Sequence, residues 1–240
     1  MKYKNLIIIG TSHIAKESLD EVKAEIEKQQ PEIIALELDK RRFYALVNNI
    51  KSKPSLRDIR KIGLKGYIFN IIGAWVEKKL GSIVGVKPGD EMLTAIHLAK
   101  KNKIQLALID QDIEITLKRI SKEFTWREKF RLIGDFFRGL IFRKRELKKL
   151  GIENLDLTKV PSNDLIKKLI KQVKKRYPNF YKVLIEERNY IMAKRLSNLI
   201  EKYPEKKIIA IIGAGHEEEM LEIIKNNDIA HKLALKQENL

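Results

Sequence analysis

The sequence predicts an α/β fold in which helices flank a central, mostly parallel sheet. Four short runs of β-branched and apolar residues are continuous rather than alternating, which is typical of strands buried on both faces of a sheet. Segments with apolar residues three and four positions apart, typical of helices, separate some of these runs. Strands that alternate with helices favour parallel pairing. The 44% hydrophobic content of the 240 residues is sufficient for a large core.

The strands and helices are predicted in chain order from these patterns. The four strands are expected at Asn5–Ile9, Glu32–Leu36, Gln105–Ile109 and Lys207–Ile212. Helical spacing is clearest in Ser18–Gln29 and Glu91–Asn102. From about residue 114 to 199 there is helical periodicity and no strand pattern. We therefore expect residues 1–240 to form one domain that contains a long helical insertion.

The insertion carries much of the positive charge. Residues 118–149 hold 12 Lys and Arg against 4 Asp and Glu, in a chain of formal net charge +17. A solvated helical face, a nucleic-acid site and a basic helix on an anionic membrane surface are three interpretations. The insertion contains five aromatic residues at helical spacing: Trp126, Phe130, Phe136, Phe137 and Phe142. This spacing is typical of a buried helical stripe, so no nucleic-acid partner is expected. The many charges of both signs also fit a thermophilic organism.

Several classes of site are excluded by composition and motif. The chain has no cysteine, so a metal ion would need His and carboxylate ligands. It contains no HExxH, Walker lysine or Gly-x-Ser-x-Gly motif, and the Gly-rich turn near residue 213 lacks the third glycine of a dinucleotide fingerprint. The apolar run after the start spans about five residues, too short for a signal-peptide core.

A short motif occurs twice, after the first and the last predicted strand. The chain reads Gly10-Thr-Ser-His13 near its start and Gly213-Ala-Gly-His216 near its end. Glycine permits a tight strand-to-helix turn. The carboxyl ends of parallel strands line the ligand crevice of an open sheet, so both histidines are expected at that edge.

The other two strands end in carboxylates. Glu37 and Asp110 directly follow them, where an unpartnered charge would be costly. Two imidazoles with one or two carboxylates can hold a divalent metal and leave a position open for water. A metal-free acid/base pair is the alternative.

Arginines accompany these carboxylates along the chain. Arg41 and Arg42 follow Glu37, Arg119 follows Asp110, and Arg188 lies in the insertion. A guanidinium keeps a buried carboxylate ionised and can hold an oxyanion. Surface ion pairing is an equally good interpretation of each.

Taken together, the motifs resemble the TraB/PrgY family, in its archaeal type. Besides the two Gly-x-x-His motifs, the resemblance rests on four further motifs spread along the chain: Glu37-Leu-Asp-x-x-Arg42, Pro88-Gly-Asp-Glu91-Met, Asp110-Gln-Asp-x-x-x-Thr-Leu-x-Arg119 and Glu187-Arg-Asn-x-x-Met-Ala193. Many relatives have arginine where this chain has Gln111. The family is similar to the GumN-like proteins and the Tiki membrane proteases and, in fold, to erythromycin esterase and the ChaN protein.

The resemblance implies a metalloprotease-like site and a link to shutting down a peptide pheromone. It places the metal ligands at His13, Glu37 and His216, with support from Arg42, Asp110, Arg119, Glu187 and Arg188. Tiki proteins are associated with Mn or Co, and His and carboxylate ligands also suit Zn. Archaeal relatives often carry a hydrophobic C-terminal region, so the full-length protein is expected to be cytoplasmic or membrane-associated.

Two functions of the site at the strand ends remain open, besides a third hypothesis in which residues 118–149 form a basic membrane-surface or nucleic-acid module. In the first, the chain is a metal-dependent hydrolase of peptides, in which Asp110 or Glu187 accepts a proton from metal-activated water and an arginine stabilises the oxyanion. In the second, the chain binds or sequesters a peptide or pheromone without cleaving it. The sequence leaves the native metal and the oligomeric state open.

Overall fold

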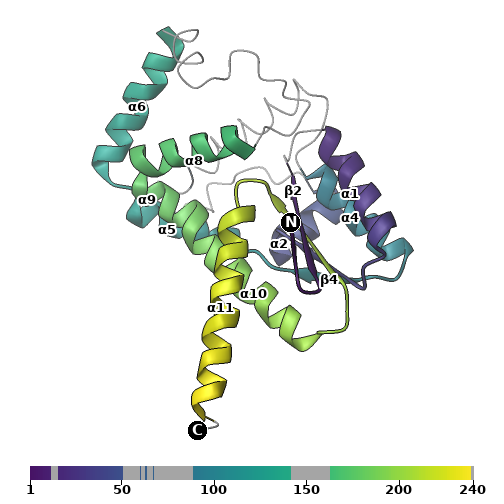
Figure 1. Cartoon of the computed structure of the whole chain (residues 1–240). Coiled ribbons are helices and arrows are strands. Elements are labelled where there is room, and N and C mark those ends of the chain that lie inside the picture. Colours follow the sequence, from purple (N-terminus) through teal and green to yellow (C-terminus); the bar gives the residue numbers. More distant parts are fainter. Residues whose placement is uncertain are drawn as a thin grey trace.

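Five strands form the sheet at the centre of the fold (Figure 1), which confirms the predicted α/β class. The computed structural model describes residues 1–11, 16–50, 89–141 and 163–238, together with Arg60, Gly63 and Tyr67. The strands are β1 (Lys2–Tyr3), β2 (Leu6–Thr11), β3 (Ile33–Leu36), β4 (Gln105–Leu108) and β5 (Ile208–Gly213). Their order is β1-β2-β5-β3-β4, with β1 antiparallel to β2 and the other four parallel.

Helices cover both faces of the sheet. On one face α1 (Lys16–Gln29) and α4 (Asp90–Lys101) pack on side chains that include Ile34 and Ile209. On the other, α10 (Glu187–Lys202) and α11 (Glu217–Glu238) pack on Ile33 and Ile208. Successive strand residues point to opposite faces, so continuous Ile runs supply both cores at once.

The predicted strands correspond to β2, β3, β4 and β5, with ends that differ by at most two residues. The two clearest helical patterns correspond to α1 and α4. The sequence pattern missed β1, because a two-residue strand has no periodicity of its own and depends on its pairing with β2.

The register of the parallel strands brings their carboxyl ends to one edge. Thr11 of β2 lies opposite Gly213 of β5, and Leu36 of β3 lies opposite both Ile211 and Leu108. The residues after these strands, including Glu37 and Asp110, therefore emerge side by side.

The described part of the predicted insertion holds helices and no strand. Its elements are α5 (Ile113–Glu123), α6 (Trp126–Ile141), α8 (Asn163–Arg176), α9 (Pro178–Tyr181), the π-helix η1 (Lys182–Glu186) and α10. The short helix α2 (Lys40–Val47) follows β3. Among the described helices, none is long and apolar enough to cross a membrane.

The expected buried aromatic stripe of the insertion is wrong for its first two members. Trp126 and Phe130 of α6 are 66% and 68% exposed. The side chains of Phe136 and Phe137, and all of Phe142, lie outside the described part of the chain. Helical spacing shows that residues share a face but not which way that face points, and here the inner face of α6 carries Glu128 instead.

Glu128 joins two helix starts. Its carboxylate accepts hydrogen bonds from the backbone and hydroxyl of Thr125, both at 3.1 Å, and the Glu128 amide donates to the Thr125 hydroxyl at 3.3 Å. This is a capping box at the start of α6. The same carboxylate accepts from the backbone amide of Asn179 at 2.8 Å and from its side chain at 3.1 Å, in the first turn of α9.

We predict that Glu128→Ala lowers the free energy of unfolding by about 2–3 kcal/mol, because it removes caps from two helices. Burial raises the pKa of Glu128, but the hydrogen bonds from Asn179 and Thr125 outweigh it and lower the pKa overall. This contribution is therefore present above the unfolded-state pKa of about 4.3 and is lost as the pH falls through the lower folded-state value. Urea unfolding at pH 7 and pH 3 measures it, with the exposed Lys122→Ala as control; an equal loss at both pH values would contradict the assignment.

Candidate functional site

Glu37 stands where β3 meets β5. It follows the last residue of β3 and is 4% exposed. Oε2 accepts a hydrogen bond of 2.6 Å from the backbone amide of Gly213, and Oε1 is paired with Arg188. The carboxylate thus lies against the glycine turn that leads to His216.

Asp110 occupies the corresponding place beyond β4. Its carboxylate accepts from Arg188 Nε at 3.0 Å and Nη2 at 2.7 Å, from Arg42 Nη2 at 2.5 Å, and from the Gln111 amide at 2.7 Å. Burial raises the pKa of Asp110, but Arg188 and Arg42 outweigh it and lower the pKa to about 2. Asp110 is therefore a permanent anion at neutral pH.

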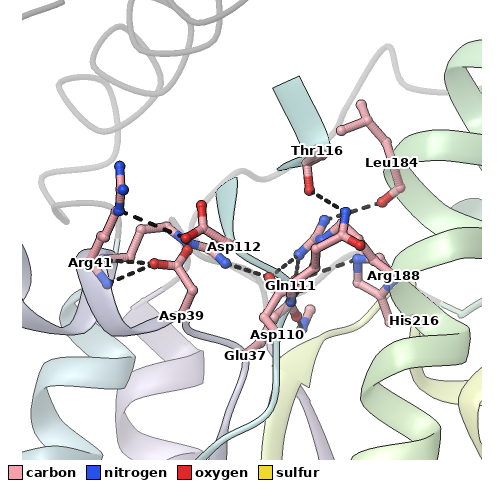
Figure 2. Close-up of polar contacts among 12 residues, drawn as sticks. Glu37, Asp39, Arg41, Asp110, Gln111, Asp112, Thr116, Leu184, Arg188 and His216 are labelled. Carbon is pink, nitrogen blue, oxygen red and sulfur yellow. Dashed lines mark hydrogen bonds and ion pairs between the residues drawn. The ribbon is translucent and has the colours of Figure 1, made fainter. Parts of the chain in front are cut away.

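Arg188 is shared by the two carboxylates, as Figure 2 shows. It is the second residue of α10, two residues after the end of the π-helix η1 (Lys182–Glu186), and its Nη1 donates to the Leu184 carbonyl within that π-helix at 3.2 Å. Burial alone would lower the pKa of Arg188, but Glu37 and Asp110 raise it above its ordinary value. One cation thus joins two strand ends to a helix of the insertion.

Arg42 is held in place by the cap of α2. Asp39 accepts from the backbone amides of Arg41 and Arg42 at 2.8 and 3.0 Å, and from Arg42 Nε at 2.6 Å. This orients Nη2 of Arg42 toward Asp110. Arg41 instead pairs with Glu114 and, at 3.7 Å, with Asp112, away from Glu37.

His216 faces Glu37 from the second Gly-x-x-His turn. His216 is buried, 6% exposed, and its backbone amide closes the turn with a 2.9 Å bond to the Gly213 carbonyl. Nε2 lies 3.5 Å from Glu37 Oε1, while Nδ1 is bonded to the Asn189 side-chain oxygen.

The orientation of Asn189 determines which nitrogen of His216 carries a proton. The Asn189 amide nitrogen donates to Glu219 Oε2 at 2.9 Å, and the Tyr181 hydroxyl donates to the same oxygen at 3.1 Å. Because a carboxylate only accepts, the Asn189 oxygen must face His216, and Nδ1–H donates to it. A neutral His216 then directs the lone pair of Nε2 toward the Glu37 carboxylate. Two electron-rich atoms repel each other, so a proton or a metal ion between them makes this arrangement favourable.

The two Gly-x-x-His turns touch each other. A Cβ atom on Gly10 would lie 2.7 Å from Glu217 Oε2 and 3.1 Å from the Ala214 Cα, so the first turn requires glycine for close approach. The Ala214 amide donates to the Thr11 carbonyl at 2.9 Å. Thr11 is the last described residue before residues 12–15, and the predicted ligand His13 lies outside the described part.

Arg119 and Glu187 form a pair of their own. Glu187 accepts from Arg119 Nη2 at 2.5 Å and Nε at 3.1 Å, and Glu123 accepts from Nη1 at 3.0 Å. Within the described residues, no hydrogen bond or ion pair joins this pair to Glu37, Asp110 or His216. The structure thus places Arg119 and Glu187 apart from the other predicted site residues that it describes. Those five form the main cluster: Glu37, Arg42, Asp110, Arg188 and His216.

Three contributors were not predicted as site residues from the sequence. Asn189 orients His216, the Gly213 amide holds Glu37, and Arg195 donates to the Asp110 carbonyl at 2.5 Å. Arg195 had a signal, since it lies seven residues after Arg188 and so shares its helical face. Gly213 and Asn189 stand in motifs quoted above, but their bonds to Glu37 and His216 join distant parts of the chain.

The donor set suits a divalent metal only in part. Among the described residues, no three His, Asp or Glu side chains are grouped to hold a metal ion. His216 Nε2 and Glu37 Oε1 fit as two ligands, because atoms that share one tetrahedral ion at about 2.0–2.2 Å lie about 3.3–3.5 Å apart. A third ligand would have to come from outside the described residues, where His13 is.

The fold and this cluster define an α/β protein in which a buried histidine and two carboxylates follow parallel strands and are joined by two arginines from helices. A model of the TraB/PrgY/gumN family matches residues 2–227. The chain belongs to this family. The similarity covers nearly the whole fold, including both Gly-x-x-His motifs.

Relatives occur in archaea and in mammals. An uncharacterized protein of Methanocaldococcus jannaschii, MJ1365, is 38% identical over 94% of this chain and 55% of its own length. TraB domain-containing proteins of Mus musculus and Homo sapiens are 21% and 22% identical over 87% of this chain and 60% of their own lengths. The chain therefore spans somewhat more than half the length of these relatives.

Proposed function

We propose that this chain is a metal-dependent hydrolase that acts on peptides at the cluster around His216 and Glu37. The observation that carries the proposal is the orientation of His216, whose Nδ1 is held by Asn189 so that Nε2 faces the Glu37 carboxylate 3.5 Å away. An imidazole anchored through one nitrogen and directed at a carboxylate through the other is the arrangement of a metal-ligand or acid/base histidine.

His216 and Glu37 would hold the metal ion, with His13 as the predicted third ligand. A divalent ion bound there, Mn, Co or Zn, would lower the pKa of a bound water and polarise the scissile carbonyl. Arg188 and the Gly213 amide hold the Glu37 carboxylate in position, and Asn189 does the same for His216.

The other charged residues divide the remaining tasks. With a pKa of about 2, Asp110 is a weak base, so we assign it to positioning Arg188. Glu187, the other acceptor predicted from the sequence, is bonded to Arg119 apart from the cluster, so no proton acceptor besides Glu37 and His216 is assigned within it. Arg42 binds Asp39 and Asp110 through Nε and Nη2, and its side chain is 33% exposed. Nη1 donates to no other residue in the described part, so we assign it to the oxyanion of the tetrahedral intermediate.

The alternative function, binding without cleavage, is compatible with the same cluster. Both carboxylate oxygens of Glu37 and of Asp110 already accept hydrogen bonds within the fold. Such saturation suits a rigid pocket that holds a peptide or pheromone as well as it suits a reaction centre.

We predict that a chelator abolishes peptide cleavage and that Mn, Co or Zn restores it. Purified protein is treated with chelator, reloaded with each metal in turn and incubated with a peptide library, and the products are read by mass spectrometry. Metal binding is measured separately by calorimetry. At a metal concentration of 100 times Kd, the ion should stabilise the fold by about 2.7 kcal/mol.

The two functions give different results in this experiment. Metal-loaded protein that binds peptides and returns them intact would replace the hydrolase with the binding function. Cleavage that persists in the chelated protein would favour a metal-free acid/base pair of His216 and Glu37. If the protein binds no metal, cleaves no peptide and binds no peptide, both functions are contradicted.

A further inference from the structure

Two large aromatic side chains lie on the outer surface of α6. Trp126 and Phe130 are 66% and 68% exposed, and their ring centroids are 6.1 Å apart. The Lys129 Nζ lies 4.1 Å from the centroid of the Trp126 ring. Exposed aromatic groups that adjoin one another in this way are typical of an interaction surface.

The rotation of α6 about its axis is fixed by polar contacts on its opposite face. Glu128 is 3% exposed and bonded to the first turn of α9. Asp135, seven residues later, accepts from the Tyr177 hydroxyl at 2.5 Å and pairs with Arg176. At about 100° per residue, Trp126 and Phe130 lie about 160° and 200° around the helix from Glu128. The aromatic rings therefore point outward because the acidic side chains are held inward.

The same contacts leave the exposed part of α6 basic. Arg127 and Arg138 are exposed, whereas Glu128 and Asp135 are engaged with α9 and the end of α8. Arg131 is also exposed but donates to the Arg176 carbonyl at 2.6 Å. Residues 118–149 as a whole hold 12 basic against 4 acidic residues. The surface thus combines aromatic rings with positive charge, and its complement is an anionic surface that accepts apolar groups.

We propose that the outer face of α6 docks on an anionic membrane surface. Trp126 and Phe130 enter the boundary between headgroups and acyl chains, and Arg127, Lys129 and Arg138 contact lipid phosphates. Trp and Phe on one face with Lys and Arg beside them are the composition of interfacial helices. A single-stranded nucleic acid is less well matched, because its bases need aromatic faces that stand apart, whereas these two rings lie against each other on a convex helix.

The test uses the full chain with vesicles of equal parts phosphatidylcholine and phosphatidylglycerol, and with vesicles of phosphatidylcholine alone. We expect sedimentation with the anionic vesicles only, weakened by salt. In a Trp75→Phe background, which leaves Trp126 as the one tryptophan, its emission should shift to shorter wavelength on binding. The double change Trp126→Ser with Phe130→Ser should lower the partition coefficient at least about tenfold. Tyr44→Ser, an aromatic residue 63% exposed on α2, is the matched control and should leave the partition coefficient unchanged.

Each other outcome overturns the proposal. No sedimentation with anionic vesicles, equal sedimentation with neutral ones, or an unchanged partition coefficient for the double variant would each do so. If light scattering finds a dimer that the double variant loses, the surface instead binds a second copy of the chain. If labelled single-stranded RNA binds at physiological salt and vesicles do not, the surface is a nucleic-acid site. Urea unfolding confirms that each variant is folded.

Discussion

Replacing Arg188 by methionine is expected to lower the free energy of unfolding by about 3–5 kcal/mol at pH 7, because it leaves two buried carboxylates without their shared cation. Glu37 is 4% exposed and Asp110 1% exposed, and Arg188 bonds to both. Methionine fills a similar volume, so the loss reports charge rather than a cavity. Urea unfolding measures it, and Tyr190→Ala, an exposed position on the same helix, should change stability by less than about 0.5 kcal/mol.

The pH dependence of the Arg188→Met variant distinguishes this explanation from a packing defect. In the parent protein the pKa of Asp110 is about 2 in the fold, against about 3.9 in the unfolded chain. Its stabilisation is therefore present above about pH 4 and is lost as the pH falls through 2. In the variant the buried carboxylates take up protons more readily, so the loss relative to the parent should shrink between pH 7 and pH 4.

A lysine at position 188 is the matching control. Arg188→Lys keeps the positive charge but cannot bond to Glu37 and Asp110 with one planar fork, so its stability should lie between those of the parent and the methionine variant. If Arg188→Met is as stable as the parent at pH 7, or if its loss is the same at pH 4, Arg188 does not hold the cluster together by charge.

Replacing His216 by alanine is expected to lower the rate of peptide hydrolysis by at least about 10²–10⁴-fold, since it removes the side chain that faces Glu37. Asn189→Leu should have a smaller effect of about 10–100-fold, because it removes only the hydrogen bond that orients His216. Activity is compared at equal concentrations of folded protein. His97→Ala is the control, since His97 lies exposed on α4, and should be as active as the parent.

This order of effects distinguishes a reaction centre from a structural histidine. A structural His216 would change stability in both variants and leave the activity per folded molecule unchanged. Equal activity of His216→Ala and the parent would remove His216 from the site, whatever the result of the chelation experiment.

The strands and the edge at which they end could be predicted because both follow from local patterns. Continuous Ile runs indicate buried parallel strands, and parallel strands place Glu37, Asp110 and His216 at one edge. The partners of these side chains could not be predicted, since Arg188 and Glu37 are 151 residues apart in the chain. Trp126 and Phe130 illustrate a second limit, because periodicity identified their common face and only the contacts of Glu128 and Asp135 determine that it points outward.

The π-helix η1 makes residues 178–202 one unbroken helical rod, from the Asn179 amide that binds Glu128 to Arg188 and on to Lys202. A π turn holds one residue more than an α-helical turn allows. Deleting one residue from 182–186 would restore regular pitch and rotate everything before it by about 100° relative to α10. The contacts of Asn179 and Tyr181, before the deletion, and those of Arg188 and Asn189, after it, could then not form at the same time. The number of residues in this segment is therefore constrained as strictly as their identity, and an insertion or deletion there is a more severe change than most substitutions.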